Sequence, residues 1–105
     1  MPINLSGVLL PITTPFTPDQ DLDAEGLAGN LAKWNETGIT GYVALGSTGE
    51  RVHLDESEYV EVIETARQAV TGNFTFIAGA GQHSTTGTIK ESERAAHAGA
   101  EAVLV

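Results

Sequence analysis

The sequence predicts an α/β fold in which short parallel strands alternate with helices. Apolar runs of strand length alternate with segments whose apolar residues recur at helical spacing. The strand starts recur at about 30 residues, close to the ~31 that an eightfold βα barrel of about 250 residues gives each unit. A glycine stands three residues before the apolar runs that begin at residues 41 and 102, which forms an internal repeat. We therefore expect four strands and three helices, which fit the start of such a barrel or a small open α/β domain.

The first βα unit is predicted within residues 7–38. Its strand covers residues 7–12, and because Pro11 lacks a backbone donor we expect the strand to bend or stop there. Asp23 is placed to cap the following helix, and Gly38 to end it. The apolar stripe of this helix consists of Leu27, Leu31 and Trp34.

The second unit begins with a nearly all-apolar run at residues 41–45. Such a run is typical of a strand that is covered on both faces of a parallel sheet. Asp55 and Glu58 have the spacing of a capping box for the next helix, which Gly72 is expected to end. The apolar stripe of this second helix consists of Tyr59, Val62, Ile63, Ala66 and Val70.

The third unit contains a strand at residues 74–78 and a loop at residues 79–85. Its helix has a thin apolar stripe and is expected to stop at Gly99. A fourth strand follows at residues 102–105. The predicted stripe of the third helix consists of Ile89, Ala95, Ala96 and Ala98.

A glycine-bracketed pair of hydroxyls follows the second strand. Gly46 and Gly49 are expected to relieve side-chain crowding, so that backbone amides and the hydroxyls of Ser47 and Thr48 converge on one small acceptor. A carboxylate or phosphate oxygen fits such a cradle. The same residue types also occur in ordinary strand-to-helix turns, and the residues alone leave both interpretations open.

Composition excludes several classes of function. Fourteen acidic and five basic residues give a formal net charge of -9, which repels nucleic acids and anionic membranes. The absence of cysteine excludes disulfides, thiolate metal sites and cysteine nucleophiles. No signal-peptide pattern and no apolar run of membrane-spanning length is found, so we expect a cytoplasmic location.

Two motifs together resemble one enzyme family. Residues 7–16 read Gly-Val-Leu-Leu-Pro-Ile-Thr-Thr-Pro-Phe, and residues 46–50 read Gly-Ser-Thr-Gly-Glu. At the ends of the first two predicted strands, this pair is similar to the start of the dihydrodipicolinate synthase and N-acetylneuraminate lyase family. The resemblance extends over the whole chain. It implies that residues 1–105 are the N-terminal segment of a single (β/α)8 TIM-barrel domain, incomplete at the C-terminus.

The resemblance also implies a pyruvate-dependent class I aldolase or synthase chemistry. In that family a lysine binds pyruvate, or a related 2-oxo acid, as a Schiff base. By this resemblance Ser47 and Thr48 hold the substrate carboxylate, Gly46 and Gly49 contribute to the same binding turn, and Ser47 joins a proton relay with a tyrosine.

Other residues near these motifs have open roles. Thr13 and Thr14 match the first strand end, where they either contact substrate or form turn structure. Glu50 is expected to bond backbone amides near the start of the next segment. Arg51 departs from the small or apolar residues of many relatives, and is either a solvated neighbour of the pocket or a charge seen by the second substrate.

The resemblance places the Schiff-base lysine and the relay tyrosine beyond Val105. Lys33 and Lys90 lie within predicted helices, where a barrel turns them toward solvent, so neither replaces the catalytic lysine. We therefore expect these 105 residues alone to be inactive. The alternative is an inactive truncated barrel segment that functions, if at all, by association, because a four-stranded sheet leaves an unpaired edge.

The resemblance implies small-molecule substrates and no cofactor. It also implies that the full-length protein is a homo-oligomer, either a dimer or a tetramer. The candidate activities are 4-hydroxy-tetrahydrodipicolinate synthase, N-acetylneuraminate lyase, and 4-hydroxy-2-oxoglutarate or 2-keto-3-deoxy sugar acid aldolase. Ser47, in place of a second threonine, leans slightly toward the aldolase and lyase branches.

Nucleotide and metal sites are weaker interpretations. Gly79 and Gly81 follow a strand, but Ser84 occupies the third glycine position of a dinucleotide fingerprint and Glu101 precedes the next strand. No P-loop sequence occurs. The histidines lack close metal-ligand spacing and are interpreted as one loop, one pocket-rim and one helix-surface residue: His53, His83 and His97.

Overall fold

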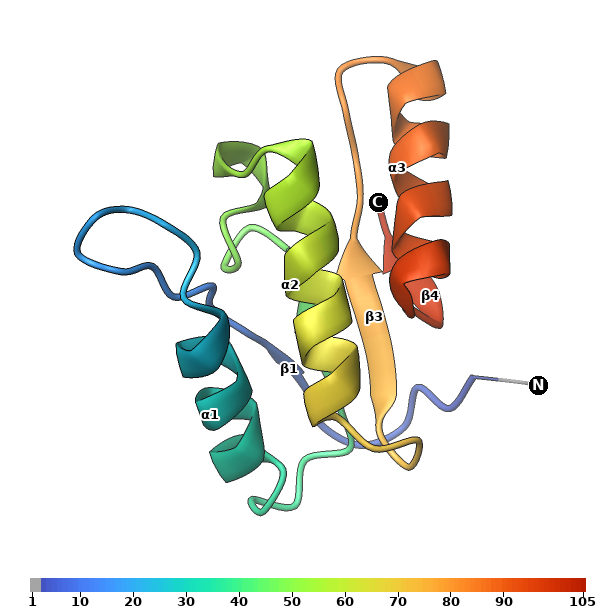
Figure 1. Cartoon of the computed structure of the whole chain (residues 1–105). Coiled ribbons are helices and arrows are strands. Elements are labelled where there is room, and N and C mark those ends of the chain that lie inside the picture. Colours follow the sequence, from blue (N-terminus) through green and yellow to red (C-terminus); the bar gives the residue numbers. More distant parts are fainter. Residues whose placement is uncertain (1–2) are drawn as a thin grey trace.

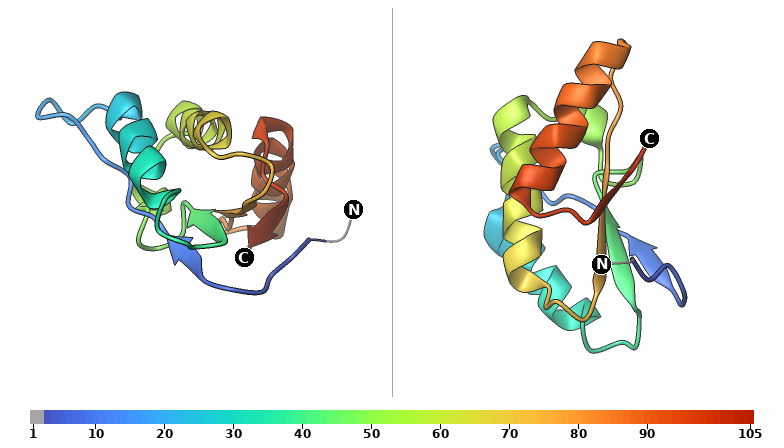
Figure 2. Two further views of the ribbon diagram at one scale, coloured as in Figure 1. Left: turned by 90° about the horizontal axis from the view of Figure 1, so that it is seen from below. Right: turned by 90° about the vertical axis from the view of Figure 1, so that its right-hand side faces the viewer.

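The structure is a computed structural model that describes residues 3–105. One sheet of four parallel strands has the order β1-β2-β3-β4, and three helices cover one of its faces (Figure 1; Figure 2, left). Parallel strands joined by helices are the repeating unit of a (β/α)8 barrel, and the four strands and three α-helices are those that the sequence predicts. The elements in chain order are β1 (Leu9–Pro11), α1 (Ala24–Trp34), β2 (Gly41–Ala44), the 3-10 helix η1 (Arg51–His53), α2 (Glu56–Ala69), β3 (Thr75–Gly79), α3 (Thr85–Ala98) and β4 (Ala102–Leu104).

The helix starts agree with the predicted capping residues. The Asp23 carboxylate accepts a hydrogen bond from the amide of Gly26 at 2.9 Å, at the start of α1. At the start of α2, Asp55 accepts from the amide of Glu58, and the Glu58 side chain accepts from the amide of Asp55. Both caps are set by residues a few positions apart, which is why the sequence is sufficient to predict them.

The helix ends agree less well with the glycines that were predicted to stop them. Gly99 caps α3 with a φ of 124°, a backbone conformation that favours glycine. Gly38 also has a positive φ, 87°, but α1 already ends at Trp34. In the same way α2 ends at Ala69, before Gly72. The repeated glycine before β2 and β4 therefore marks the approach to each strand more reliably than the end of each helix.

The apolar face of α3 differs from the predicted one. Ile89 is 54% exposed and Ala96 is also exposed, whereas Glu91 and Ala95 are buried. The predicted stripe was therefore wrong at Ile89 and Ala96, because these two aliphatic residues lie outside the inward face and the charged residue Glu91 belongs to it. The largest side chains of the core are Tyr42, Phe76, Ile12, Leu27, Leu31, Leu45, Ile63 and Val62.

The two outer strands each have a single neighbour in the sheet. Pro11 is the last residue of β1, as expected from its missing backbone donor. Val8 before β1 and Leu104 in β4 are 62% and 58% exposed, so both edges present apolar side chains. Within the described residues, no helix has the length and apolar character needed to cross a membrane.

Candidate functional site

The carboxyl ends of the strands meet at one edge of the sheet, where ligands bind in parallel α/β folds. The segments that leave β1, β2 and β3 at this edge are residues 12–16, 45–50 and 80–84. Because β1 pairs with β2, the two motifs identified in the sequence are neighbours. The hydroxyl of Thr14 bridges them by donating to the carbonyl of Gly49 at 2.7 Å.

The predicted hydroxyl pair lies in a tight turn at this edge. The amide of Gly49 donates to the carbonyl of Gly46, and the amide of Glu50 donates to the carbonyl of Ser47, both at 3.1 Å. These two bonds leave the amides of Ser47 and Thr48 outside the turn's own pairing, and both side chains are exposed. A hollow of about 120 Å³ beside the turn is lined by Gly46, Ser47, Glu50, Arg51, Val52 and His53.

The two glycines of the turn have different roles. A Cβ on Gly49 would lie 2.8 Å from the amide nitrogen of Leu45 and 3.1 Å from the carbonyl of Ile12, so crowding excludes a side chain there, as predicted. At Gly46 the nearest atom would be the Cγ1 of Val43 at 3.9 Å, so the prediction of crowding was wrong for this residue. The chain instead changes direction at Leu45, whose φ is 60°.

The threonine pair is divided between interior and surface. Thr14 is buried with its hydroxyl donated to the backbone, whereas Thr13 is exposed at the same edge. The predicted capping role of Glu50 was wrong: its backbone has a φ of 59° and its side chain makes no capping bond to η1. Thr13 thus remains available to a ligand, and Glu50 lines the hollow beside the turn without capping η1.

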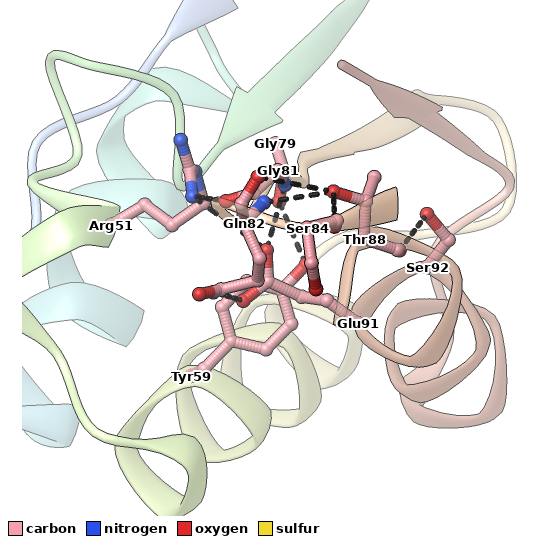
Figure 3. Close-up of polar contacts among 9 residues, drawn as sticks. All are labelled: Arg51, Tyr59, Gly79, Gly81, Gln82, Ser84, Thr88, Glu91 and Ser92. Carbon is pink, nitrogen blue, oxygen red and sulfur yellow. Dashed lines mark hydrogen bonds and ion pairs between the residues drawn. The ribbon is translucent and has the colours of Figure 1, made fainter. Parts of the chain in front are cut away.

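The Arg51 side chain reaches the loop after β3, as Figure 3 shows, and only 22% of it is exposed. Its guanidinium donates to the carbonyl of Gly81 and lies 3.6 Å from the Glu91 carboxylate. Glu91 also accepts from the amide of Gly81 at 2.8 Å and from the side chain of Gln82 at 2.6 Å. Arg51 therefore joins the loop after β2 to the loop after β3, a role that neither of the two sequence-based interpretations included.

Tyr59 supports the same region from α2. Its hydroxyl donates to the carbonyl of Gly79 at 2.7 Å. Burial, together with the nearby negative charge of Glu91, raises the pKa of the Tyr59 hydroxyl far above its usual value, while Arg51 and Arg94 oppose this shift. Tyr59 is thus a neutral hydrogen-bond donor throughout the physiological pH range.

The loop after β3 is unsuited to the nucleotide-binding interpretation. The amide of Gly81, which would have to face a phosphate, already donates to Glu91. A buried carboxylate at this position also repels an anion. The loop instead forms one wall of a hollow of about 460 Å³, which is lined by Arg51, Val52, Leu54, Ala80, Gly81, Gln82, His83 and Val105.

Sequence reasoning missed Glu91 altogether and missed the close backbone approach at Gly79. Glu91, Ala95 and Ala98 are spaced at i, i+4 and i+7 along α3, so a search for the inward face that allowed one acid would have found Glu91. Gly79 ends a strand that is otherwise made of larger residues, a pattern that indicates close approach of another backbone. Lys33 and Lys90, by contrast, are exposed on helices as predicted.

Comparison with known proteins gives one consistent result. The model of the dihydrodipicolinate synthetase family matches residues 4–105. The 4-hydroxy-tetrahydrodipicolinate synthase of Anaplasma marginale (strain Florida) is 39% identical over 103 residues, which are 98% of this chain and 34% of that protein. The enzyme of the same name from Methanosphaerula palustris is 43% identical over 101 residues, 94% of this chain and 35% of that protein.

A solved structure agrees with these relatives. A prophage protein of the dihydrodipicolinic acid synthase family from E. coli K12, in complex with pyruvate, superposes with a TM-score of 0.87 at 30% identity. The superposition covers 94% of this chain and 33% of that protein. The chain thus spans about one third of the length of the relatives that it matches.

Proposed function

Since the chain belongs to the dihydrodipicolinate synthetase family, we propose that it forms the N-terminal segment of a barrel enzyme that joins pyruvate to an aldehyde or releases it. The observation that carries this proposal is the turn after β2, whose two hydroxyls are exposed at the carboxyl edge of the sheet. The substrate is pyruvate or a related 2-oxo acid. The aldehyde, and hence the choice between synthase and lyase, stays open among the activities named above.

In this proposal Ser47 and Thr48 bind the carboxylate of the 2-oxo acid. Their hydroxyls and the amides left outside the turn are donors, and a carboxylate accepts several such bonds. Anchoring the carboxylate fixes the adjacent carbonyl carbon, so that attack by a lysine becomes an oriented, effectively intramolecular step. Ser47 has the further role of relaying a proton to or from the reacting oxygen.

The lysine and the relay tyrosine belong to later strands of the proposed barrel, outside residues 1–105. The lysine amine adds to the substrate carbonyl and loses water to give an iminium, which accepts the electron pair of the carbanion formed next. We propose that the full-length enzyme is a cytoplasmic homo-oligomer. The gene sequence beyond Val105 provides a direct check, because the proposal requires a tyrosine and a lysine at later strand ends.

Borohydride trapping tests the Schiff base. The full-length protein incubated with pyruvate and borohydride should gain the mass of a reduced pyruvate adduct on one lysine. Omission of pyruvate should abolish the adduct. A protein that gains no mass under these conditions does not use a pyruvate Schiff base, and the proposed function is then wrong.

Two substitutions test the hydroxyl pair. Ser47→Ala and Thr48→Val should each weaken use of the 2-oxo acid by about 1–3 kcal/mol in kcat/KM, since each leaves a buried carboxylate oxygen without a partner. Ser92→Ala is the matched control, because that hydroxyl donates within α3 to the carbonyl of Thr88. Unchanged steady-state kinetics in both site variants would show that the motif is an ordinary turn that does not bind the substrate.

A further inference from the structure

The direction of the hydroxyl turn is set by one unusual backbone position. Leu45 is fully buried and has a φ of 60°, a conformation that costs a branched residue free energy. Such a conformation persists only where the surrounding structure enforces it. The residues that hold Leu45 therefore also determine where Ser47 and Thr48 point.

The first of these residues is Gly79, at the end of β3. A Cβ at Gly79 would collide with the carbonyl oxygen of Leu45 and would lie 3.0 Å from the amide nitrogen of Gly46. The peptide that enters the turn thus rests directly on the backbone of the neighbouring strand. Tyr59 fixes this support from the helix side through its bond to the Gly79 carbonyl (Figure 3).

The second is Thr14, which follows β1 on the opposite side of the turn. Its hydroxyl donates to the carbonyl of Gly49 at 2.7 Å, and only 4% of the residue is exposed. Gly49 itself lies against the backbone of Leu45 and Ile12. Thr14 therefore holds the end of the turn, while Gly79 holds its beginning.

We propose that Thr14 and Gly79 are positioning residues for the carboxylate-binding turn, an inference that rests on the proposed function. Neither residue needs to contact the substrate. They keep the hydroxyls and amides of Ser47 and Thr48 aligned before the 2-oxo acid binds, so the donors need no reorganisation. Loss of either support should raise the KM for pyruvate and leave the maximal rate of the lysine chemistry less affected.

Thr14 provides the sharper kinetic test, made in the full-length protein. Thr14→Val keeps the side-chain shape but removes the donor, and should raise the KM for pyruvate roughly 10-fold, the scale expected for a slightly misplaced anchor. Thr14→Ser retains the hydroxyl and should restore most of the lost affinity. Thr75→Val is the matched control, since the Thr75 hydroxyl is also buried and donates to a carbonyl, that of Asn4, at the opposite end of the sheet.

Amide hydrogen exchange without substrate tests the same role independently. In Thr14→Val the amides of Gly49 and Glu50, which are hydrogen-bonded within the turn, should exchange at least several-fold faster, with no such change in Thr75→Val. Gly79→Ala should have the same effect, with Gly29→Ala as control because a Cβ there meets nothing within 4 Å. If Gly79→Ala does not fold, as circular dichroism would show, the Thr14 variants decide.

The two proposals fail in distinguishable ways. A wild-type protein that forms no pyruvate adduct overturns the proposed function, whereas faster exchange at the Gly49 and Glu50 amides in Thr14→Val still supports the positioning role. Unchanged exchange in Thr14→Val overturns the positioning role even where pyruvate is trapped. A raised KM with unchanged exchange also overturns it, because Thr14 then contacts the substrate directly.

Discussion

The loops after β2 and β3 leave the same edge of the sheet but are held by different chemical groups, a neutral hydroxyl in one and a carboxylate in the other. The loop after β2 is fixed at its backbone, by the Thr14 hydroxyl on the Gly49 carbonyl and by two bonds within the turn. The loop after β3 is fixed by the buried Glu91 carboxylate, which binds the Gly81 amide and the Gln82 side chain. The hydroxyls of Ser47 and Thr48 stay exposed in the loop after β2, whereas the Gln82 side chain of the loop after β3 is bound to Glu91, which favours the loop after β2 as the binding element.

The largest expected effect follows from removing the anchor of the loop after β3. Glu91→Ala leaves the Gly81 amide and the Arg51 guanidinium without their carboxylate, and should lower the free energy of unfolding by about 2–4 kcal/mol. Urea denaturation measures this change. Glu93→Ala, at an exposed position of the same helix, should change stability by less than about 0.5 kcal/mol. Equal losses in the two variants would contradict the anchoring role of Glu91.

The two loops also differ in how far a sequence can predict them. The capping box of Asp55 and Glu58 was predictable because both partners lie within one helical turn. The Ser47–Thr48 pair was recognisable from its flanking glycines. The hydrogen bond from Thr14 to Gly49 joins residues 35 positions apart, and no local sequence pattern predicts it.

The contacts of the loop after β3 were harder to predict from the sequence. Glu91 has the charge of the many surface acids around it, and its spacing with Ala95 and Ala98 indicates an inward position without indicating that it binds the Gly81 amide. The positive φ of Leu45 depends on space left by Gly79 on another strand. Long-range contacts therefore decide the site geometry, while local chemistry decides which residues are present.

A pH titration sharpens the comparison because Tyr59 supports only the β3 side directly. Burial raises the pKa of Tyr59 in the folded protein, so the folded state retains a proton that the unfolded chain loses above pH ~10. The contribution of Tyr59 to the free energy of unfolding is fully present below that pH. It declines as the pH rises further, by up to about 1.4 kcal/mol per pH unit. Tyr59→Phe should remove this part of the decline, as measured by urea unfolding between pH 8 and 11.

Tyr42 is the matched control for this titration. Burial also raises the pKa of its hydroxyl, which donates to the side chain of Asn35, far from both loops. Tyr42→Phe should therefore flatten the pH dependence of stability, as Tyr59→Phe does. Unlike Tyr59→Phe, it should leave amide exchange in residues 80–84 unchanged. A Tyr59→Phe variant with the wild-type alkaline slope would show that the tyrosine ionises as readily in the fold as in the unfolded chain.

The smallest expected effect concerns Glu50, whose side chain should be dispensable if the loop after β2 is held by its backbone. Glycine relieves the positive φ at this position but adds conformational freedom to the unfolded chain, so Glu50→Gly should change stability by less than about 0.5 kcal/mol. Glu93→Gly inside α3 should cost about 1 kcal/mol, because glycine there gains nothing in the folded state. Thermal or urea unfolding compares the two variants. A loss in Glu50→Gly as large as that in Glu93→Gly would mean that this loop, too, depends on a side chain, and the contrast between the two loops would then be one of degree.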